Sequence, residues 1–442
     1  MKIKEILKIT NGELICGEEN TNCENFSTDS RKIQKGDVYI ALKGENFDGN
    51  TFYENAINNG ATVCILSCNP KIKIGNIIKV KDTLKALQEI AKYKRSLYNI
   101  PVIAVTGSVG KTSTKDLIAS VMSQKYKVLK TEGNLNNNIG LPLTILKLKD
   151  EEAMVIEMGM NHFGEISLLT KIAKPTLAVI TNIGTAHIGI LGSRENILKA
   201  KLEILESLQG NTVVINNDND LLCDWNKKND TYNVITYGIK NKESKYVAEN
   251  IESFEDKSIY TINDKKVIVP VGGEHFVLNS LCAMAVGMYF NIPMDKIIKG
   301  ISTFELTKKR MEINKTKLGA IIINDTYNAN YDSMKAAIDY LEKIEGRRKV
   351  AVLGDMLELG EYSERLHKAV GDEIKNIDIL ITVGNQAKFI AKNAKIKNIF
   401  QFDSNEDAIK CIKNIIEKND AVLLKASNSM RFNEIAESLK QL

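Results

Sequence analysis

Residues 102–114 read VIAVTGSVGKTST, an apolar run that passes through two glycines into a Lys-Thr pair. The run predicts a buried β-strand, and the residues after Gly110 predict a helix. In such a unit the loop N–H groups hold phosphate oxygens, while Lys111 reaches the terminal phosphates and the Thr112 hydroxyl binds Mg²⁺. The loop is two residues shorter than the common phosphate loop, so a plain glycine turn is the competing interpretation. We favour a nucleotide site formed by Gly107, Ser108, Val109, Gly110, Lys111, Thr112 and Ser113.

The composition is that of a globular chain with several domains. Its 442 residues exceed what one hydrophobic core usually organises, and 43% hydrophobic and 26% charged residues are ordinary values. The net charge of +5 is small, and no Lys/Arg cluster alternates with aromatic residues, so we expect no nucleic-acid partner. No signal-peptide core or membrane-length apolar run is visible, so we expect a cytoplasmic protein, or one bound only peripherally to a membrane. We also expect a monomer. Seven scattered cysteines predict reduced thiols.

From residue 100 onward, short apolar runs alternate with helix-length segments. Runs that are apolar at successive positions are typical of strands covered on both faces, so the pattern predicts an α/β fold with mainly parallel sheets. The expected strands are 102–106, 153–158, 177–183, 212–216, 320–324, 349–354, 379–384 and 421–426. The expected helices are 82–98, 111–125, 195–208, 279–290, 294–302, 333–345, 363–375 and 405–418. Pro101 and the polar stretch 308–316 predict boundaries, which gives three domains over 1–99, 100–311 and 312–442.

Several segments resemble the Mur ligases, the ATP-dependent amide-forming enzymes of bacterial cell-wall precursor synthesis. TGSVGKTST resembles their ATP loop. The similarity continues in EGNLNNNIGLPLTIL (132–146), IEMGMNHFGEI (156–166), TNIGTAHIGILGSRENILKAKLEIL (181–205), NDTYNANYDSM (324–334) and GDMLELGEYSE (354–364), which are most similar to the members that add D-alanyl-D-alanine. TDSRKIQKGDVYIALKGENFDGNTF (28–52) resembles the UDP-sugar-peptide domain shared with the third-residue-adding sibling. The resemblance implies a small α/β UDP-substrate domain, a central P-loop ATPase domain and a C-terminal Rossmann-like domain that binds the amine.

The resemblance also implies a reaction. ATP phosphorylates the peptide carboxylate of UDP-N-acetylmuramoyl-tripeptide, the amine of D-alanyl-D-alanine attacks the acyl phosphate, and phosphate leaves. ATP and two Mg²⁺ ions are the implied cofactors. Two alternatives remain open: a related ligase for another amine, such as D-alanyl-D-serine or a single amino acid, and a P-loop switch that only binds nucleotide.

Four residues are assigned to catalysis: Lys111, Glu157, His187 and Lys201. Glu157 ends an apolar strand at the edge where α/β sheets place ligands; from the residues alone it is an ordinary polar strand end, and His187 an ordinary buried imidazole. Lys201 lies on a helix pattern and by itself reads as a surface lysine. The resemblance makes Glu157 a Mg²⁺ ligand and His187 a ligand of a second Mg²⁺ site or a group near that metal. It also implies that Lys201 carries CO₂ as N6-carboxylysine, which requires a desolvated, neutral amine. The implied metal residues are Thr112, Glu157, His187 and Lys201.

The substrate residues rest on the resemblance. Asn279, Arg310 and Asp325 are assigned to ATP, although Asn279 also suits a helix N-cap. The UDP-substrate residues are Ser30, Arg31, Asp48, Asn136 and Asn137, and Arg31 suits a surface salt bridge equally well. The amine-substrate residues are Tyr327, Asn328 and Asn330. The chain departs from the family pattern at Asn50, Tyr331 and Asn428, of which the last two bear on dipeptide specificity rather than on ligase chemistry.

Overall fold

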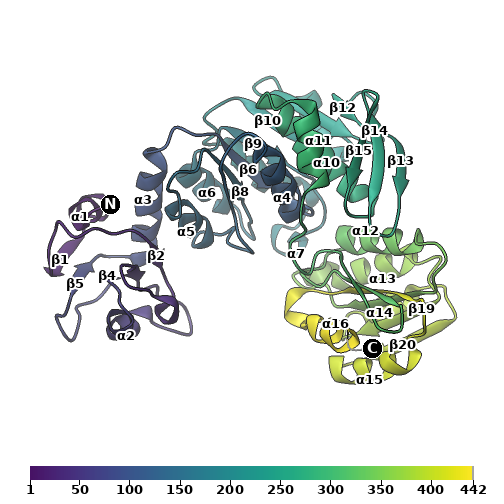
Figure 1. Cartoon of the computed structure of the whole chain (residues 1–442). Coiled ribbons are helices and arrows are strands. Elements are labelled where there is room, and N and C mark those ends of the chain that lie inside the picture. Colours follow the sequence, from purple (N-terminus) through teal and green to yellow (C-terminus); the bar gives the residue numbers. More distant parts are fainter. Residues whose placement is uncertain (441–442) are drawn as a thin grey trace.

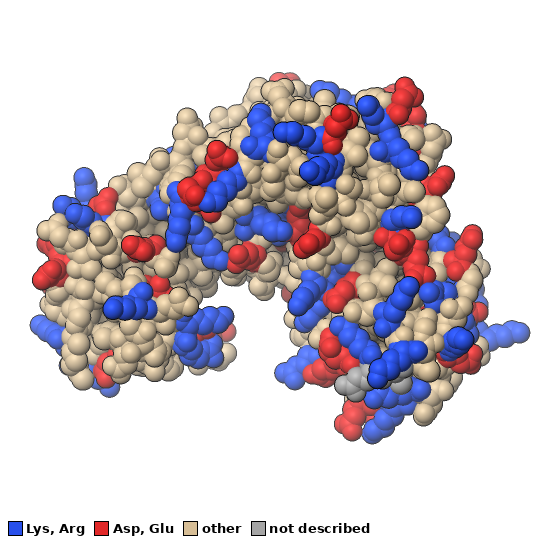
Figure 2. All heavy atoms as spheres, viewed as in Figure 1, with Lys and Arg blue, Asp and Glu red and all other residues tan. Residues whose placement is uncertain are grey.

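The computed structural model describes residues 1–440 and has the shape of an arch (Figure 1). The N-terminal segment forms one foot, the strands around the glycine loop lie in the crown, and the C-terminal segment forms the other foot. The space-filling view shows an open hollow between the two feet (Figure 2). For description we use the three predicted domains, 1–99, 100–311 and 312–442, and call them N-terminal, central and C-terminal.

The N-terminal domain is a five-stranded sheet flanked by helices. The strand order is β1 (Glu13–Cys16), β5 (Asn76–Lys79), β4 (Val63–Leu66), β3 (Val38–Ile40) and β2 (Phe26–Ser27), with only β1 antiparallel. The helices are α1 (Ile3–Thr10), α2 (Tyr53–Asn58) and α3 (Thr83–Ser96). Arg95 on α3 donates to the Ala173 carbonyl of the central domain (2.8 Å), so α3 fastens the first domain to the second.

The central domain is built on a seven-stranded, fully parallel sheet. Its order is β12 (Tyr246–Val247), β11 (Asn233–Gly238), β10 (Thr212–Asn216), β9 (Leu177–Ile180), β6 (Val102–Thr106), β8 (Ala153–Glu157) and β7 (Val128–Lys130). The helices are α4 (Lys111–Met122), α5 (Gly140–Leu146), α6 (Glu165–Ala173), α7 (Ile188–Leu191), α8 (Arg194–Leu202), α9 (Asp220–Lys227), α10 (Glu274–Tyr289) and α11 (Met294–Ser302). Because parallel strands end at one edge, the loops after β6, β8 and β9 meet there.

A second, smaller sheet lies beside α10 and is antiparallel. It consists of β13 (Glu249–Ser253), β14 (Ser258–Ile262) and β15 (Lys265–Val269).

The C-terminal domain carries a six-stranded sheet that is parallel except for its first strand. Its order is β16 (Glu312–Lys315), β17 (Ile321–Asn324), β21 (Ala421–Lys425), β18 (Lys349–Gly354), β19 (Ile379–Val383) and β20 (Asn398–Phe402). The helices are α12 (Tyr331–Glu342), α13 (Ser363–Glu373), α14 (Lys388–Asn393), α15 (Asn405–Ile415) and α16 (Asn433–Leu439). The α/β prediction is confirmed in all three domains.

Three local expectations need correction. Helix α10 begins at Glu274 with Gly273 as its N-cap, so Asn279 lies inside the helix and the N-cap interpretation of this residue is wrong. Helix α12 begins two residues earlier than expected because Asn330 caps it through the Ser333 amide. The antiparallel sheet β13–β15 was not expected. All seven cysteines are unpaired, as predicted.

Candidate functional site

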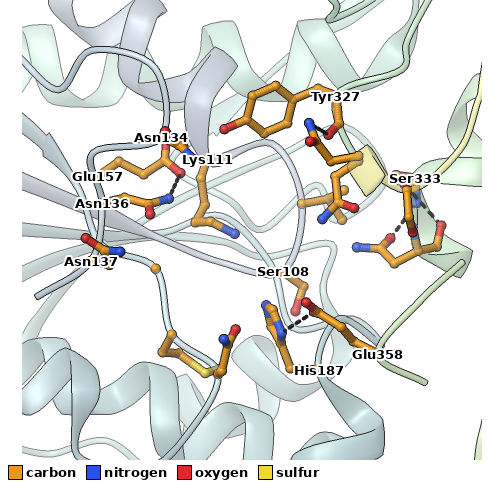
Figure 3. A pocket seen from close by; sticks show the side chains of 18 of the residues that line it. Ser108, Lys111, Asn134, Asn136, Asn137, Glu157, His187, Tyr327, Ser333 and Glu358 are labelled. Carbon is orange, nitrogen blue, oxygen red and sulfur yellow. Dashed lines mark hydrogen bonds and ion pairs between the residues drawn. The ribbon is translucent and has the colours of Figure 1, made fainter. Parts of the chain in front are cut away.

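A cleft of about 1100 Å³ opens between the central and C-terminal domains. The glycine loop forms its floor, together with the loops after β7 and β8. The linker 308–310 and the loops after β17, β18 and β21 line the other side. Figure 3 shows Lys111 between two interacting pairs, Glu157 with Asn136 and His187 with Glu358.

The glycine loop is held by the loop that follows β9. Asn182 Oδ1 accepts the N–H groups of Ser108 (3.1 Å) and Val109 (2.9 Å). A Cβ on Gly107 would lie 1.9 Å from Thr181 Oγ1, and Gly110 caps α4 with φ +79°, so both positions require glycine. The first N–H groups of α4 therefore face the cleft from a rigid base.

Lys111 folds back over this loop. Its Nζ donates to the Gly107 carbonyl (2.7 Å), and desolvation lowers its pKa. The side chain lines the cleft and can turn from the carbonyl to an anion without moving the helix.

Glu157 is the best-defined acidic group on the floor. The carboxylate is 2% exposed, accepts from the Thr112 hydroxyl (2.8 Å) and accepts from Asn136 Nδ2 (2.7 Å). Arg310 Nη2 donates to the same Thr112 hydroxyl (3.1 Å). The last residue of β8, the first turn of α4 and the interdomain linker thus converge on one point.

Lys201 is buried, contrary to the surface-lysine interpretation. It is 1% exposed on α8, and its pKa lies well below the usual value because burial disfavours the ammonium and Lys111 repels it. No carboxylate among the described residues raises the Lys201 pKa in compensation. Burial and the neighbouring Lys111 charge therefore favour the neutral amine over the ammonium at this position.

The four predicted metal residues are not assembled as a ready-made cluster. Within residues 1–440, no group of three or more His, Cys, Asp or Glu side chains is placed to hold an ion. Thr112 and Glu157 are in contact, whereas His187 Nδ1 lies 3.0 Å from Glu358 Oε2 of the C-terminal domain. The hydroxyl and carboxylate oxygens are hard donors and fit Mg²⁺.

A smaller cavity of about 170 Å³ adjoins the loop and is lined by several of the predicted ATP residues. Ser113, Asn279, Arg310 and Asp325 line it, beside the rings of His275 and Phe276. Asp325 accepts from the buried Lys425 ammonium and from the Met311 amide (3.2 Å), so it also ties the linker to the C-terminal sheet.

The predicted amine residues lie on the C-terminal wall of the cleft. The Arg310 guanidinium stacks on the Tyr327 ring at 3.8 Å from its centroid. The Asn328 carbonyl accepts from Lys425 Nζ (3.1 Å), and Asn330 caps α12. Two of the departures from the family pattern fit into this wall: Asn428 Nδ2 donates to the Tyr327 carbonyl (3.0 Å), and the Tyr331 hydroxyl donates to Glu373 (2.7 Å).

The predicted UDP-substrate residues are divided between two places. Asn136 and Asn137 line the cleft, whereas Ser30, Arg31 and Asp48 lie in the N-terminal domain outside both cavities. Arg31 is 84% exposed and pairs with Asp29 (2.8 Å), which lowers the Asp29 pKa to about 2. Asp48 caps a short 3₁₀ helix and accepts from Asn50 Nδ2 (2.7 Å).

Beyond the linker, the central and C-terminal domains touch in two places. Glu255 and Glu274 of the central domain bind Arg347 and Lys343. Residues 184–192, which contain His187, meet the C-terminal domain directly. Asp332 Oδ2 accepts from the Thr185 amide (2.7 Å) and hydroxyl (2.9 Å). A Cβ on Gly184 would lie 2.3 Å from Asp332 Oδ2, and one on Gly189 would lie 2.5 Å from the Leu359 backbone. At these two positions the domains therefore approach each other so closely that only glycine fits.

Three residues of the site were not singled out from the sequence: Asn182, Asp332 and Glu358. Each stands in a segment whose similarity was noted, but a role for it follows only from contacts between loops or domains. Their polar side chains directly after a strand or at a helix start were the available signal.

Within residues 1–440, no helix combines the length and apolar character needed to cross a bilayer. The chain matches three families: "Mur ligase family, catalytic domain" over residues 23–95, "Mur ligase middle domain" over 105–287 and "Mur ligase, glutamate ligase domain" over 309–428.

Two curated relatives are similar over almost the whole chain, and both are named UDP-N-acetylmuramoyl-tripeptide--D-alanyl-D-alanine ligase. The Bacillus subtilis protein is 39% identical, over 99% of this chain and 98% of the relative. The Escherichia coli protein is 33% identical over the same shares. Among solved structures, MurF from Acinetobacter baumannii is 30% identical with a TM-score of 0.92, covering 99% of this chain and 98% of that one. The MurF ligase from Thermotoga maritima in complex with ADP is 30% identical with a TM-score of 0.84, covering 94% and 97%.

Proposed function

This chain belongs to the Mur ligase family, and we propose that it joins D-alanyl-D-alanine to the peptide carboxylate of UDP-N-acetylmuramoyl-tripeptide with ATP as the energy source. The observation that carries the proposal is one cleft lined by the phosphate loop, by Glu157, which accepts a hydrogen bond from Thr112, and by the loops of the C-terminal sheet. A nucleotide switch would need the first two features but not the third. We place the reaction in the cytoplasm and the protein as a monomer.

In the proposed mechanism, the loop 107–112 and Lys111 bind the ATP phosphates. Lys111 exchanges the Gly107 carbonyl for a phosphate oxygen, and the adenosine enters the smaller cavity beside Asn279 and His275. Thr112 and Glu157 would hold Mg²⁺, whose charge offsets that of the phosphates. Arg310, which already contacts Thr112, reaches the same phosphates from the linker.

We propose that Lys201 is carboxylated. Its neutral amine adds to the carbon of CO₂ and releases one proton, which leaves a carbamate anion in place of the amine. Support comes from burial without a compensating carboxylate. The carbamate would provide an oxygen donor for a second Mg²⁺, and His187 would join it after leaving Glu358.

The two substrates approach from opposite sides in this proposal. The UDP-sugar binds near Ser30, Arg31 and Asp48, and the peptide crosses the hollow to Asn136 and Asn137. The dipeptide binds the wall of Tyr327, Asn328 and Asn330. We expect the C-terminal domain to close towards the nucleotide when the substrates bind, and this closure would keep water from the acyl phosphate.

Phosphate release across a small matrix of substrates tests the proposal. With ATP and Mg²⁺, phosphate should appear only when UDP-N-acetylmuramoyl-tripeptide and D-alanyl-D-alanine are both present, and mass spectrometry should detect the pentapeptide product. Faster release with D-alanyl-D-serine or a single amino acid would favour a related ligase. Release that needs neither substrate would favour the switch.

A further inference from the structure

Glu358 projects from the C-terminal wall of the cleft, and we propose that its carboxylate binds the ammonium group of the incoming amine substrate. This inference rests on the proposed function and adds a specificity residue to it. Among the described residues of the C-terminal domain that line the cleft, Glu358 is the one with a formal charge; the others bear amide, hydroxyl, phenol or aliphatic side chains.

The other charges around the cleft leave this role to Glu358. Lys111 and the linker residues Lys308, Lys309 and Arg310 are cations that suit phosphates and carboxylates and repel an ammonium. The Glu157 oxygens are engaged by Thr112 and Asn136. Glu165 accepts from the Asn161 amide (2.6 Å) and lies near His162 (3.4 Å). The Glu358 side chain is 51% exposed, so its carboxylate remains accessible.

The loop that carries Glu358 is held rigidly. The Met356 amide donates to His367 Nε2 (3.0 Å), and the Leu357 amide donates to Ser427 Oγ (2.9 Å). Glu358 itself has φ +65°, a conformation that is unfavourable for a residue with a Cβ. Such strain persists where the surroundings enforce it and is often found at ligand sites. The loop therefore presents the carboxylate in one direction.

The Glu358 carboxylate points to the place that the attacking substrate amine must occupy. Figure 3 shows Glu358 reaching across the domain boundary to His187, close to Ser108 of the glycine loop. A nitrogen lies 3.0 Å from Glu358 Oε2 here, namely His187 Nδ1. A substrate nitrogen bound in the same place would sit between the amine wall and the phosphate loop, and a carboxylate that fixes it there orients the nucleophile.

The test replaces Glu358 by Gln, which keeps the shape and removes the charge, with Glu361→Gln as the matched control. Glu361 is exposed three residues further on the same segment and does not line the cleft. In the Glu358→Gln variant, KM for D-alanyl-D-alanine should rise about tenfold to a hundredfold, while KM for ATP and for the UDP-tripeptide stays within about twofold. Glu361→Gln should behave as the wild type.

A second probe separates recognition from a structural role. N-acetyl-D-alanyl-D-alanine has the same carboxyl end without the ammonium, so its inhibition constant should be equal for the wild type and Glu358→Gln. If that constant worsens as much as KM for the dipeptide, or if only kcat falls, Glu358 is structural and the inference is overturned. The inference is also overturned if the wild type is active and Glu358→Gln has the same kinetic constants. A wild type that never requires the dipeptide overturns the proposed function instead.

Discussion

Removing the Asp332 side chain should weaken the contact of the C-terminal domain with residues 184–192 of the central domain. Asp332→Ala deletes the acceptor of both Thr185 donors and leaves them without a protein partner at a site where Thr185 is 9% exposed. Hydrogen bonds to a charged group contribute about 1.5–3 kcal/mol each. Because water replaces part of the loss when the domains separate, we take about 2–4 kcal/mol for the pair. Closure of the C-terminal domain over the central domain, which this contact supports, should then become roughly 30-fold to 1000-fold less favourable.

The amine-dependent step should report this change most directly. We expect kcat/KM for D-alanyl-D-alanine to fall by a similar factor, and the radius of gyration with ATP analogue, UDP-tripeptide and dipeptide to stay at its ligand-free value. Gly184→Ala attacks the same contact from the other side, since its Cβ would lie 2.3 Å from Asp332 Oδ2. The double variant should lose less than the sum of both single variants.

Asp339→Ala is the control, because Asp339 is exposed on the same helix. Asp332→Ala with kcat/KM within threefold of wild type and normal ligand-induced compaction would refute the coupling. Strictly additive losses in the double variant would do so as well.

Three other substitutions test the site. Lys111→Ala should lower phosphate release by about a thousandfold or more with an unchanged melting temperature, since it removes a charge-assisted contact to the transferred phosphoryl group; turnover near the wild-type rate in a folded variant would contradict the phosphate loop. Lys201→Ala should be almost inactive and should recover with a short carboxylic acid; better rescue by an amine would contradict the carbamate. His275 has a pKa lowered to about 4 by desolvation, so its stabilising effect is complete above about pH 6.5 and is lost as the pH falls toward 4. The free energy of unfolding can be followed by the fluorescence of Trp225, the only tryptophan. Between pH 7 and 5 it should fall by about 1–2 kcal/mol less in His275→Gln than in wild type. In the exposed control His162→Gln it should fall as in wild type.

Strands buried on both faces were predictable because short continuous apolar runs are compatible with few other secondary structures. β6, β10 and β18 match the expected ranges 102–106, 212–216 and 349–354. The sheet β13–β15 was missed because it is half exposed, as in β15 with three exposed positions of five, so its strands lack the long continuous apolar runs of the buried sheets. The Asn263-Asp264 pair, both with positive φ, was the hairpin signal that could have revealed it.

The site residues likewise divide into those that a local sequence pattern predicts and those that it does not. Lys111 and Glu157 stand directly beside a predicted strand, so their places follow from the sheet edge. The burial of Lys201 could not be predicted, because α8 carries a neighbouring lysine, Lys199, in the same turn. Contacts such as Asp332 with Thr185 join residues 147 positions apart, and no local pattern encodes them.

The two glycines at the domain contact restrict how this sequence can change over generations. Neither Gly184 nor Gly189 has a positive φ, so each is required by the closeness of the opposite surface and not by its own backbone. Every single-nucleotide change that replaces glycine either adds a side chain or stops the chain. Neutral substitution is therefore excluded at both positions unless the facing residue changes first. Asp332 would have to be replaced by a shorter residue before Gly184 could accept a side chain. We expect a viable lineage to exchange these partners in that order.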